Sequence, residues 1–591
     1  MRKYDGRRLV SSLLLLATSS LLYACAQSKT SKTSPPTQKV EKADRGSIED
    51  VHLRDKGTLY QNIDDTGVVT MYLTVRRGNI SENTNHSWQE VNNYSAEEYE
   101  RMGVKRYQVA GLLQVGNEEG PEAGQVGYGE EVPNATVQIR GQSSSRGDQK
   151  NYKIELKKNK GSWQGQRTIN LNKHYYDTMR FRNKLAFDLI EGIPQIMGLR
   201  TQFVHLYVKD ETGDNPSGKF EDYGLYTQVE QVNKTSLEAH GLDRNANFYK
   251  VNDFEFYREE DTIVTEDDPK FDQDKFEKML EIKGDRDHRK LINMLTRLND
   301  TSVSVEELLA QDFDAENLQY WMAFQILMGN IDSQNRNMFI YSPQNSTRWY
   351  ILPWDEDGIF YRTERAMRPN AYDTTDDFEK GVSNYWGNIL FQRLLKSDDF
   401  RKGLDKAIAD VRSYVTQKRV SEMMEAYAGV VKPYLNKLPD SMHAHLKGQR
   451  YDEVMKALPT ELDKNFQEYQ ESLVRPQPFY IGVPKEENGK VTVAWSASYD
   501  FAQKPILYDV EVARDPEFKD LIKNQNDVRG LSITMDKLPK GQYFIRVVAK
   551  NSEGKIQHAF DRYRKDLAVL YGIKSFYVLE DGKIAGDNYD Q

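Results

Sequence analysis

The sequence predicts the α+β fold class, with a strand-rich N-terminal part, a helical part after it and an all-β module at the C-terminus. Three observations lead to this prediction. Runs rich in β-branched and aromatic residues occur between residues 68 and 251, apolar residues three and four apart begin near residue 273, and alternating apolar runs return after residue 490. At 591 residues the chain is long enough for about three globular units.

Composition and charge exclude two classes of protein. The chain has 81 basic and 90 acidic residues, and the formal net charge of -9 leaves no basic surface for nucleic acid, so we expect no nucleic-acid partner. Only 38% of the residues are hydrophobic, which excludes a polytopic membrane protein. The mild acidity is explained by solubility and needs no specific partner.

The first 25 residues predict a secretory signal with a lipid attachment site. Basic residues within the first eight precede an uncharged, largely apolar run over residues 9–24, which is short for a membrane span. The run ends in Leu-Leu-Tyr-Ala-Cys, which resembles the bacterial lipobox, although Tyr23 is bulkier than usual. The resemblance implies lipidation of Cys25 and a protein anchored to the bacterial cell membrane outside the cytoplasm. An ordinary cleaved signal peptide with an incidental cysteine is the alternative.

The rest of the chain divides into a tether, a body, a module and a tail. Cys25 is the only cysteine, so no disulfide can form within the chain. Residues 26–50 are rich in Ser, Thr, Lys and Pro and predict a flexible tether. We expect the ordered body at 51–474, the all-β module at 475–565 and a C-terminal tail at 566–591.

A Gly- and Ser-rich loop at residues 141–151 lies between two predicted strands, 135–140 and 152–156. Such loops allow backbone N–H groups to approach a phosphate, and Lys153 could reach the same anion from the returning strand. The pattern is not a Walker loop, because no Lys-Ser/Thr pair follows its second glycine. Taken alone, a polar hairpin with a surface lysine is the simpler interpretation.

Further helices and strands are predicted after this hairpin. Apolar residues at helical spacing predict a helix over 177–191, with Asp177 or Thr178 as its cap. A later helix can be capped by Asp314 and ends near Gly329, and we interpret its Trp and Met residues as core. Additional strands are expected at 203–208, 223–229 and 247–251.

The central stretch, residues 326–360, carries the residues most suited to chemistry. Asp332 and Asn337 stand five residues apart on an expected loop. Asp355 and Asp357 close the apolar run that follows, and carboxylates at strand ends are candidates for holding a metal or moving a proton. The first pair also has the D-x-x-x-x-N spacing of the protein-kinase catalytic loop, in which the Asp takes the substrate hydroxyl proton and the Asn holds magnesium.

Five segments occur in an order that resembles the CotH kinase family, named for spore coat protein H. They are RGQSS...KNYKIEL, DTMRFRNKLAFDL, DYGLYTQVEQV, NIDSQNRNMFIY and ILPWDEDGIF, and the resemblance covers roughly residues 68–400. It implies an atypical protein-kinase-like body of two lobes, a β-rich N-lobe and a helical C-lobe. It also implies ATP-dependent phosphorylation of serine on a protein substrate, with Mg²⁺ as cofactor.

Carried over onto matching positions, the resemblance suggests a role for each candidate residue. Asp332 matches the catalytic acid, and Asn337 and Asp355 match the magnesium ligands. Asp357 is either a further metal candidate or a strand-end residue bonded to backbone. The nucleotide-side candidates are Arg140, Gly141, Ser143, Ser144, Lys153 and Glu230. The ordinary kinase Gly-rich loop and the His-Arg pair before the catalytic Asp are absent from the sequence, so the likeness to typical kinases is limited to spacing and chemistry.

Apolar and polar residues alternate in the C-terminal module at 491–495, 506–513 and 542–549, which predicts strands. Residues 538–543 look like the tyrosine corner of a β-sandwich, and the whole resembles a fibronectin type III module. We expect an all-β sandwich that serves as a spacer or as an adhesive module contacting cell wall or matrix. The tail after Arg564 is not explained by that fold.

The predicted location and the predicted chemistry conflict, because a lipoprotein works outside the cytoplasmic membrane, where ATP is scarce. The expected substrate of a kinase there is a surface or secreted protein that contains serine. A competing hypothesis is a non-catalytic, surface-anchored binding protein or adhesin that uses the kinase-like body as a scaffold. A carbohydrate-active enzyme would need two carboxylates facing across a cleft, and a hydrogen-bonded acidic turn would need no catalysis at all.

Overall fold

The computed structural model describes residues 52–214, 216, 218–367, 377–565 and 568–586. The predicted signal peptide with Cys25 and the predicted tether lie outside these residues. The expected mixture of helices and strands is confirmed, with strands predominating before residue 251 and helices between residues 273 and 472.

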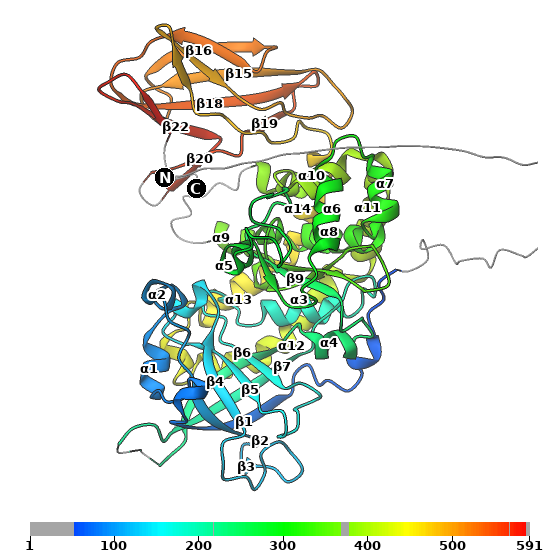
Figure 1. The fold of residues 1–591 in the computed structure, drawn as a ribbon, viewed down its shortest axis with the longest axis vertical. Coiled ribbons are helices and arrows are strands. Elements are labelled where there is room, and N and C mark those ends of the chain that lie inside the picture. The colour runs from blue at the N-terminus through cyan, green and yellow to red at the C-terminus, as the bar shows by residue number, and fades with distance from the viewer. Residues whose placement is uncertain (1–51, 215, 217, 368–376, 566–567, 587–591) are drawn as a thin grey trace, which may run out of the picture. The chain divides into compact units, whose positions relative to one another are not determined.

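The N-terminal strands form a closed barrel (Figure 1). Strand β1 pairs in parallel with β7 on one side and antiparallel with β2 on the other, so the sheet closes on itself. Alternating residues such as Leu73, Ile154 and Leu206 fill the barrel interior. The strands are β1 (Val68–Arg76), β2 (Val109–Asn117), β3 (Gly120–Pro121), β4 (Ala135–Arg140), β5 (Asn151–Leu156), β6 (Thr168–Asn172), β7 (Thr201–Asp210) and β8 (Glu221–Glu230).

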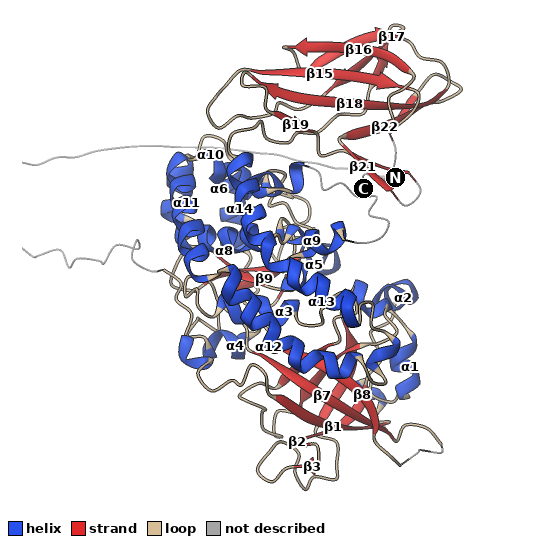
Figure 2. Ribbon diagram, turned by 180° about the vertical axis from the view of Figure 1, so that it is seen from behind, coloured by secondary structure: helices blue, strands red, loops and turns tan. Residues whose placement is uncertain are grey.

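A helical part follows the barrel and packs against it through α12, which contacts β8 (Figure 2). It encloses a small sheet of order β10-β9-β11-β12, comprising β9 (Asn247–Val251), β10 (Leu280–Ile282), β11 (Met338–Ser342) and β12 (Tyr350–Pro353). Two short helices beside the barrel are α1 (Trp88–Asn93) and α2 (Ala96–Met102), and α3 (Arg182–Ile190) and α4 (Lys234–Ala239) come next. The later helices are α5 (Gln273–Met279), α6 (Arg289–Asn299), α7 (Val305–Gln311), α8 (Ala315–Met328), α9 (Tyr361–Ala366), α10 (Ile389–Lys396), α11 (Asp398–Tyr414), α12 (Gln417–Leu435), α13 (Gly448–Ala457) and α14 (Glu461–Ser472).

Helix α8 forms the centre of the helical part and was well predicted by its sequence. Nearly all of its side chains are buried, including Trp321 and Met322, which belong to the core as expected. The carboxylate of Asp314 accepts a hydrogen bond of 2.8 Å from the backbone N–H of Asn317, as an N-cap does. At the other end Gly329 has φ 65°, the left-handed conformation that ends many helices.

The prediction of a helix beginning at residue 177 was wrong at its N-terminal end. Helix α3 starts at Arg182, five residues later, because Arg180 has φ 62°, which helical backbone excludes. Asp177 instead accepts a hydrogen bond of 2.8 Å from the backbone N–H of Arg182. The preceding turn therefore holds polar side chains in place and is not part of the helix.

The C-terminal residues form two sheets that share one core and a third, two-stranded sheet of β20 and β21. The first has the order β13-β14-β17 and the second β16-β15-β18-β22-β23. The hydroxyl of Tyr543 donates a hydrogen bond of 2.7 Å to the carbonyl of Pro539, as a tyrosine corner requires. The strands are β13 (Lys485–Glu487), β14 (Lys490–Ala494), β15 (Ile506–Ala513), β16 (Leu521–Val528), β17 (Ser532–Asp536), β18 (Gly541–Asn551), β19 (Ile556–His558), β20 (Arg562–Lys565), β21 (Ala568–Tyr571), β22 (Ile573–Val578) and β23 (Ile584–Gly586). The expected tail at 566–591 thus contributes β22, which pairs with β18, and belongs to the larger sheet.

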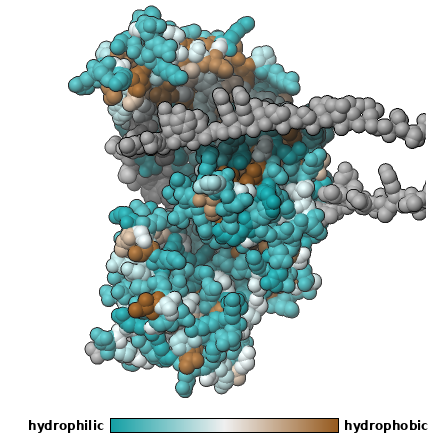
Figure 3. Space-filling view, in the orientation of Figure 1, coloured by the Kyte–Doolittle hydropathy of each residue, from teal (hydrophilic) through white to brown (hydrophobic). Residues whose placement is uncertain are grey.

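The surface seen in Figure 3 is mostly hydrophilic, with hydrophobic side chains in small separate groups. No helix among the residues that the structure describes is long and apolar enough to cross a membrane.

A buried ionic network joins the first described residues to the body. His240 lies between two carboxylates, with its Nδ1 2.6 Å from Asp55 and its Nε2 3.1 Å from Glu230. Burial alone lowers the pKa of His240, but these two hydrogen bonds outweigh it and raise the pKa to about 9. Arg200 binds both oxygens of Glu230 at 3.0 and 2.6 Å, so this network is charged and internally paired.

This network predicts a pH dependence of folding stability. The pKa of His240 is raised from 6.5 to about 9, so its contribution is complete below pH 6.5 and is lost as the pH rises through about 9. Over that window we expect the free energy of unfolding of the wild type to fall by about 3 kcal/mol more than that of His240→Gln. Urea denaturation at several pH values measures the difference. Parallel pH profiles for the two proteins would contradict the assignment of charge to His240.

Candidate active site

The loop between α8 and β11 brings Asp332 and Asn337 into contact. The side-chain N–H₂ of Asn337 donates to the backbone carbonyl of Asp332 at 3.1 Å and to its Oδ2 at 3.0 Å. The amide oxygen of Asn337 makes no hydrogen bond to any other residue in the described part of the chain. Arg336 forms an ion pair with Asp253, and its Nε lies 3.7 Å from Asp332 Oδ1. The spacing seen in the sequence therefore corresponds to a direct contact.

The β11–β12 hairpin places a second acidic segment beside this loop. Met338 lies opposite Pro353 in an antiparallel pair, so the residues before β11 and those after β12 emerge at the same end of the sheet. Asp355 follows β12 with an exposed side chain. Asp357 comes two residues later and is partly buried. The hairpin register is therefore what joins the two halves of the acidic site.

Glu356, between these two aspartates, points the other way and is fully buried. Its carboxylate accepts hydrogen bonds from Gln325 at 2.7 Å and Asn330 at 2.8 Å, and its backbone N–H donates to Asn183 at 3.2 Å. Burial raises the pKa of Glu356 to about 8. This residue fastens the acidic turn to α3 and α8, a role that the sequence alone did not suggest.

The acidic side chains repel one another across the site. Burial, followed by repulsion from Asp355 and two further carboxylates, raises the pKa of Asp357 well above its usual range. Burial also raises the pKa of Asp332, with repulsion from Asp355 adding to the shift and Arg336 opposing it. Ionising these carboxylates is therefore unfavourable in the protein alone, and a bound cation would relieve that penalty.

Arg182 neutralises two buried carboxylates next to the site, those of Asp177 and Glu364. Its guanidinium is buried and lies 2.8 Å from Asp177 and 2.7 Å from Glu364. Thr178 also donates a hydrogen bond of 2.7 Å to Glu364. These two acids are thus paired, and Asp332, Asp355 and Asp357 are the carboxylates left to act on a ligand.

Backbone strain accumulates at this site. A left-handed conformation costs a non-glycine residue about 1–3 kcal/mol and is found most often at functional sites. Five such residues belong to the site or adjoin it, namely His174, Arg180, Asp253, Asn337 and Asp355. His174 is buried, and burial lowers its pKa to about 4 against the attraction of Asp177 and Asp355. No spacing pattern in the sequence could have identified it.

The loop between β4 and β5 supplies the opposite wall. Arg140, at the end of β4, lies 5.8 Å from the ring centre of Trp354 and within electrostatic reach of Asp355. Burial lowers the pKa of Arg140 to about 10, and Asp355 opposes that shift. Gly141 has φ 89°, and a Cβ there would lie 2.1 Å from Ser144 Oγ, so only glycine fits.

The remaining nucleotide-side candidates do not all lie at the acidic site, because Lys153 and Glu230 are paired with other residues. Ser144 Oγ accepts a hydrogen bond of 3.0 Å from Asn151, and Ser143 is exposed. Lys153 is paired with Glu155 at 2.9 Å. Glu230 is held by Arg200 and His240, so the structure does not bring it to the acidic residues.

Lys250 on β9 is the cation that the sequence analysis did not assign. It lies within electrostatic reach of Asp355 and Arg140, and burial lowers its pKa while Glu281 and Asp355 oppose the shift. Lys250 lies opposite Phe339 in the β9–β11 pair, so the same small sheet carries it and leads into the acidic residues. Finding it required the pairing of strands far apart in the sequence.

The donor set suits a hard cation in its chemistry. Asn337, Asp355 and Asp357 offer amide and carboxylate oxygens, which are the ligands that Mg²⁺ prefers. Among the described residues, the one group of His and acidic side chains whose ligand atoms all lie within 4.8 Å of one another is elsewhere: His52, Asp314 and Glu316. In that group Asp314 caps α8 and Glu316 is paired with Arg54 at 2.7 Å, so we interpret it as a structural ion-pair cluster.

Comparisons with known proteins match the part of the chain that contains this site. A family model described as "CotH kinase protein" matches residues 137–469, more than half of the chain and a range that includes every acidic residue named above from Asp177 to Glu364. The chain is 23% identical over 288 residues to "Inner spore coat protein H" of Bacillus subtilis (strain 168), which covers 48% of this chain and 73% of that protein.

Two solved structures were also matched. A crystal structure of the Helicobacter pylori proinflammatory kinase CtkA has 12% sequence identity and a TM-score of 0.25, covering 54% of this chain and 90% of that one. The twitchin kinase region from C. elegans has 10% identity and a TM-score of 0.14, covering 69% of this chain and 71% of that one. At these TM-scores neither structure contributes to the assignment of the fold.

The position of Arg182 predicts a large stability effect. Replacing it in Arg182→Met leaves Asp177 and Glu364 as buried carboxylates without their cation, which we expect to cost about 3–5 kcal/mol. Urea denaturation measures the loss. The matched control is Arg244→Met, because Arg244 pairs with Glu238 on the surface and should change stability by less than about 1 kcal/mol. Equal losses in the two variants would contradict a buried bridging role for Arg182.

Proposed function

The chain belongs to the CotH kinase protein family, and from that premise we propose that it transfers the γ-phosphate of ATP to serine side chains of a protein substrate, with Mg²⁺ as cofactor. The observation that carries the proposal is the contact between Asp332 and Asn337, placed by the β11–β12 hairpin beside Asp355. In protein kinases one such Asp takes the proton of the acceptor hydroxyl, and an Asn and a second Asp hold Mg²⁺.

Asp332 would act as the base toward the acceptor hydroxyl. Asn337 fixes its Oδ2 at 3.0 Å, which leaves Oδ1 to accept a hydrogen bond from a serine hydroxyl. A raised pKa makes this carboxylate a better proton acceptor than an ordinary aspartate. General-base catalysis of this kind typically contributes about 10² to 10⁴-fold to the rate.

Arg140 and Lys250 would offset the charge of the ATP phosphates. Both lie within electrostatic reach of Asp355, so phosphates near that residue would meet positive charge from the barrel and from the small sheet. The β4–β5 loop would add backbone N–H groups, because Gly141 allows a close approach. We do not assign Lys153 to the phosphates, as the sequence had suggested, because it is paired with Glu155.

Asn337, Asp355 and Asp357 would hold the cation. Two features fit this function: the amide oxygen of Asn337 accepts no hydrogen bond from the residues that the structure describes, and the carboxylates of the acidic segment repel one another. When bound, Mg²⁺ supplies positive charge that stabilises the phosphoryl group as it is transferred. Arg182 would keep Asp177 and Glu364 paired, so that they do not compete for the same ion.

Two substitutions separate nucleotide binding from transfer. Wild-type protein should show a thermal shift with Mg-ATP, and Asp355→Ala should lose it because a phosphate-side ligand is missing. Asp332→Asn should keep the shift but lose transfer to protein serines by about 10²-fold or more, because it lacks a base. Thermal denaturation and phosphoserine detection are the two measurements.

Two results would overturn these assignments. Retained transfer in Asp332→Asn would remove its role as base. If the wild type gave no thermal shift at millimolar ATP, a non-catalytic surface-binding scaffold would become the better account of the kinase-like body.

We further propose that the protein is lipidated at Cys25 and anchored to the outer face of the bacterial cell membrane. Its substrates would then be surface or secreted proteins, and the C-terminal sheets, a fibronectin type III-like module, would contact wall or matrix. The lipobox-like sequence before Cys25 supports this location. Cys25→Ser should move the protein from the membrane fraction to the soluble fraction. Unchanged fractionation of that variant would rule out the lipid anchor.

A further inference from the structure

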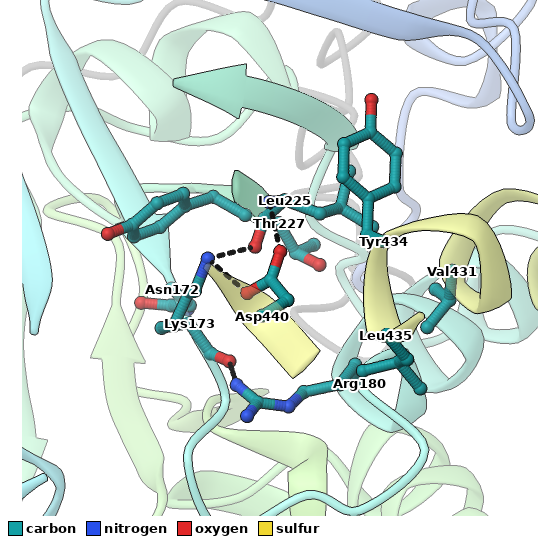
Figure 4. Close-up of a pocket in the computed structure, with 10 residues that line it drawn as sticks. Asn172, Lys173, Arg180, Leu225, Thr227, Val431, Tyr434, Leu435 and Asp440 are labelled. Atoms are coloured by element: carbon teal, nitrogen blue, oxygen red, sulfur yellow. Dashed lines mark hydrogen bonds and ion pairs between the residues drawn. The ribbon is translucent and has the colours of Figure 1, made fainter. Parts of the chain in front are cut away.

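A buried polar cluster lies between the barrel and the helical part, outside the residues proposed to react. It consists of Gln149, Lys173, Arg180 and Asp440, here called the Asp440 cluster, and each of them is less than 10% exposed. Figure 4 shows Lys173 and Asp440 pointing toward each other, with Arg180 beside them. The four residues come from the β4–β5 loop, the position directly after β6, the turn before α3 and a short turn after α12.

Lys173 has no capacity left to bind a ligand. Its ammonium group donates to Asp440 Oδ1 at 2.6 Å and to the carbonyls of Tyr223 at 2.7 Å and Leu225 at 3.0 Å, which uses its three hydrogens. Burial lowers the pKa of Lys173 to about 8, and Asp440 opposes the shift. The adjoining cavity has a volume of about 10 Å³, room for no more than one water molecule. The cluster therefore holds neighbouring segments together and is not a substrate pocket.

Asp440 uses its own oxygens to join three segments. Oδ2 accepts a hydrogen bond of 2.8 Å from the backbone N–H of Leu225, and Oδ1 accepts a second one, of 3.1 Å, from the side chain of Gln149. The approach is possible because residue 224 is glycine with φ 75°, where a Cβ would lie 2.1 Å from Asp440 Oδ2. Barrel strands β6 and β8 are thus tied to the turn that follows α12.

Gln149 is held at both ends of its amide. Its Nε2 donates to Asp440, and its Oε1 accepts from Arg180 at 3.3 Å. Arg180 is fixed in turn by the carbonyl of Lys173 and, at 3.0 Å, by that of His443. Gln149 lies in the same β4–β5 loop as Gly141, so its hydrogen bonds to Asp440 and Arg180 hold this loop in place.

We propose that Gln149 and Asp440 are positioning residues for phosphoryl transfer, fixing the β4–β5 loop in the place where its backbone meets the phosphates of ATP. This inference rests on the proposed function. Neither residue would touch the nucleotide, and both act through the loop. A loop held in its bound position loses less entropy when ATP binds. The cluster should therefore increase the affinity for ATP and have little effect on the rate of the chemical step.

Gln149→Ala is the most selective test, because it removes the loop contact and leaves the Lys173–Asp440 ion pair in place. In the full-length chain we expect the KM for ATP to rise about tenfold, with kcat nearly unchanged. Hydrogen exchange of the loop backbone should become faster in the same variant, whether or not nucleotide is present. The matched control is Gln142→Ala in the same loop, where the side chain is exposed and bonded to Glu100 at 2.9 Å.

A double-mutant cycle identifies the contact through which the loop is held. Asp440→Asn should also raise the KM for ATP, and adding Gln149→Ala to it should cause less than the sum of the two separate effects. Full additivity would mean that the two residues do not act through their shared hydrogen bond, and would overturn the proposal.

The two readouts distinguish failure of this inference from failure of the proposed function. If the wild type binds ATP but Gln149→Ala matches Gln142→Ala in KM and in loop exchange, the positioning role is wrong. If loop exchange rises in Gln149→Ala but the wild type neither binds ATP nor transfers phosphate, the proposed function has failed, and the positioning role in transfer fails with it.

Discussion

The antiparallel register of β11 and β12, which sets Met338 opposite Pro353, is the constraint on which the candidate site depends. It makes the Asp332 loop and the Asp355 turn leave the small sheet at the same end. A slip of one residue would turn the side chains of one strand to the other face and separate the two acidic segments. The aromatic residues of this sheet, among them Phe339 and Tyr350, are buried and make such a slip costly.

Electrostatics then divides the acidic residues into two groups. Arg182 takes two carboxylates into buried ion pairs, so they contribute to the frame of the site. The other carboxylates repel one another, and together with burial this repulsion raises the pKa values of Asp332 and Asp357. Positive charge comes from Arg140 and Lys250, on two different sheets, and this leaves the region around Asp355 suited to a phosphate with its metal.

The sequence predicted what depends on local pattern. The Asp314 cap and the end of α8 at Gly329 are both present, and Asp332 and Asn337, selected by their spacing, lie on one loop. It failed where partners are distant in the chain: β22 pairs with β18 although the last segment carries no clear signal, and Glu230 lies in an ionic network with residues from three other segments. The positions of Lys250, His174 and the Asp440 cluster relative to the site depend on contacts between distant segments. No local sequence pattern predicts such contacts.

Phosphoryl transfer from ATP at the Asp332–Asp355 site is tested most directly by following the γ-phosphate itself. Full-length protein would be incubated with γ-labelled ATP, Mg²⁺ and a library of serine-containing peptides, and labelled residues would be identified by mass spectrometry. Label on serine, absent when each serine is replaced by alanine and absent without Mg²⁺, is the predicted result. ATP that binds to the protein while no serine becomes labelled, on the peptides or on surface proteins supplied in their place, would contradict it.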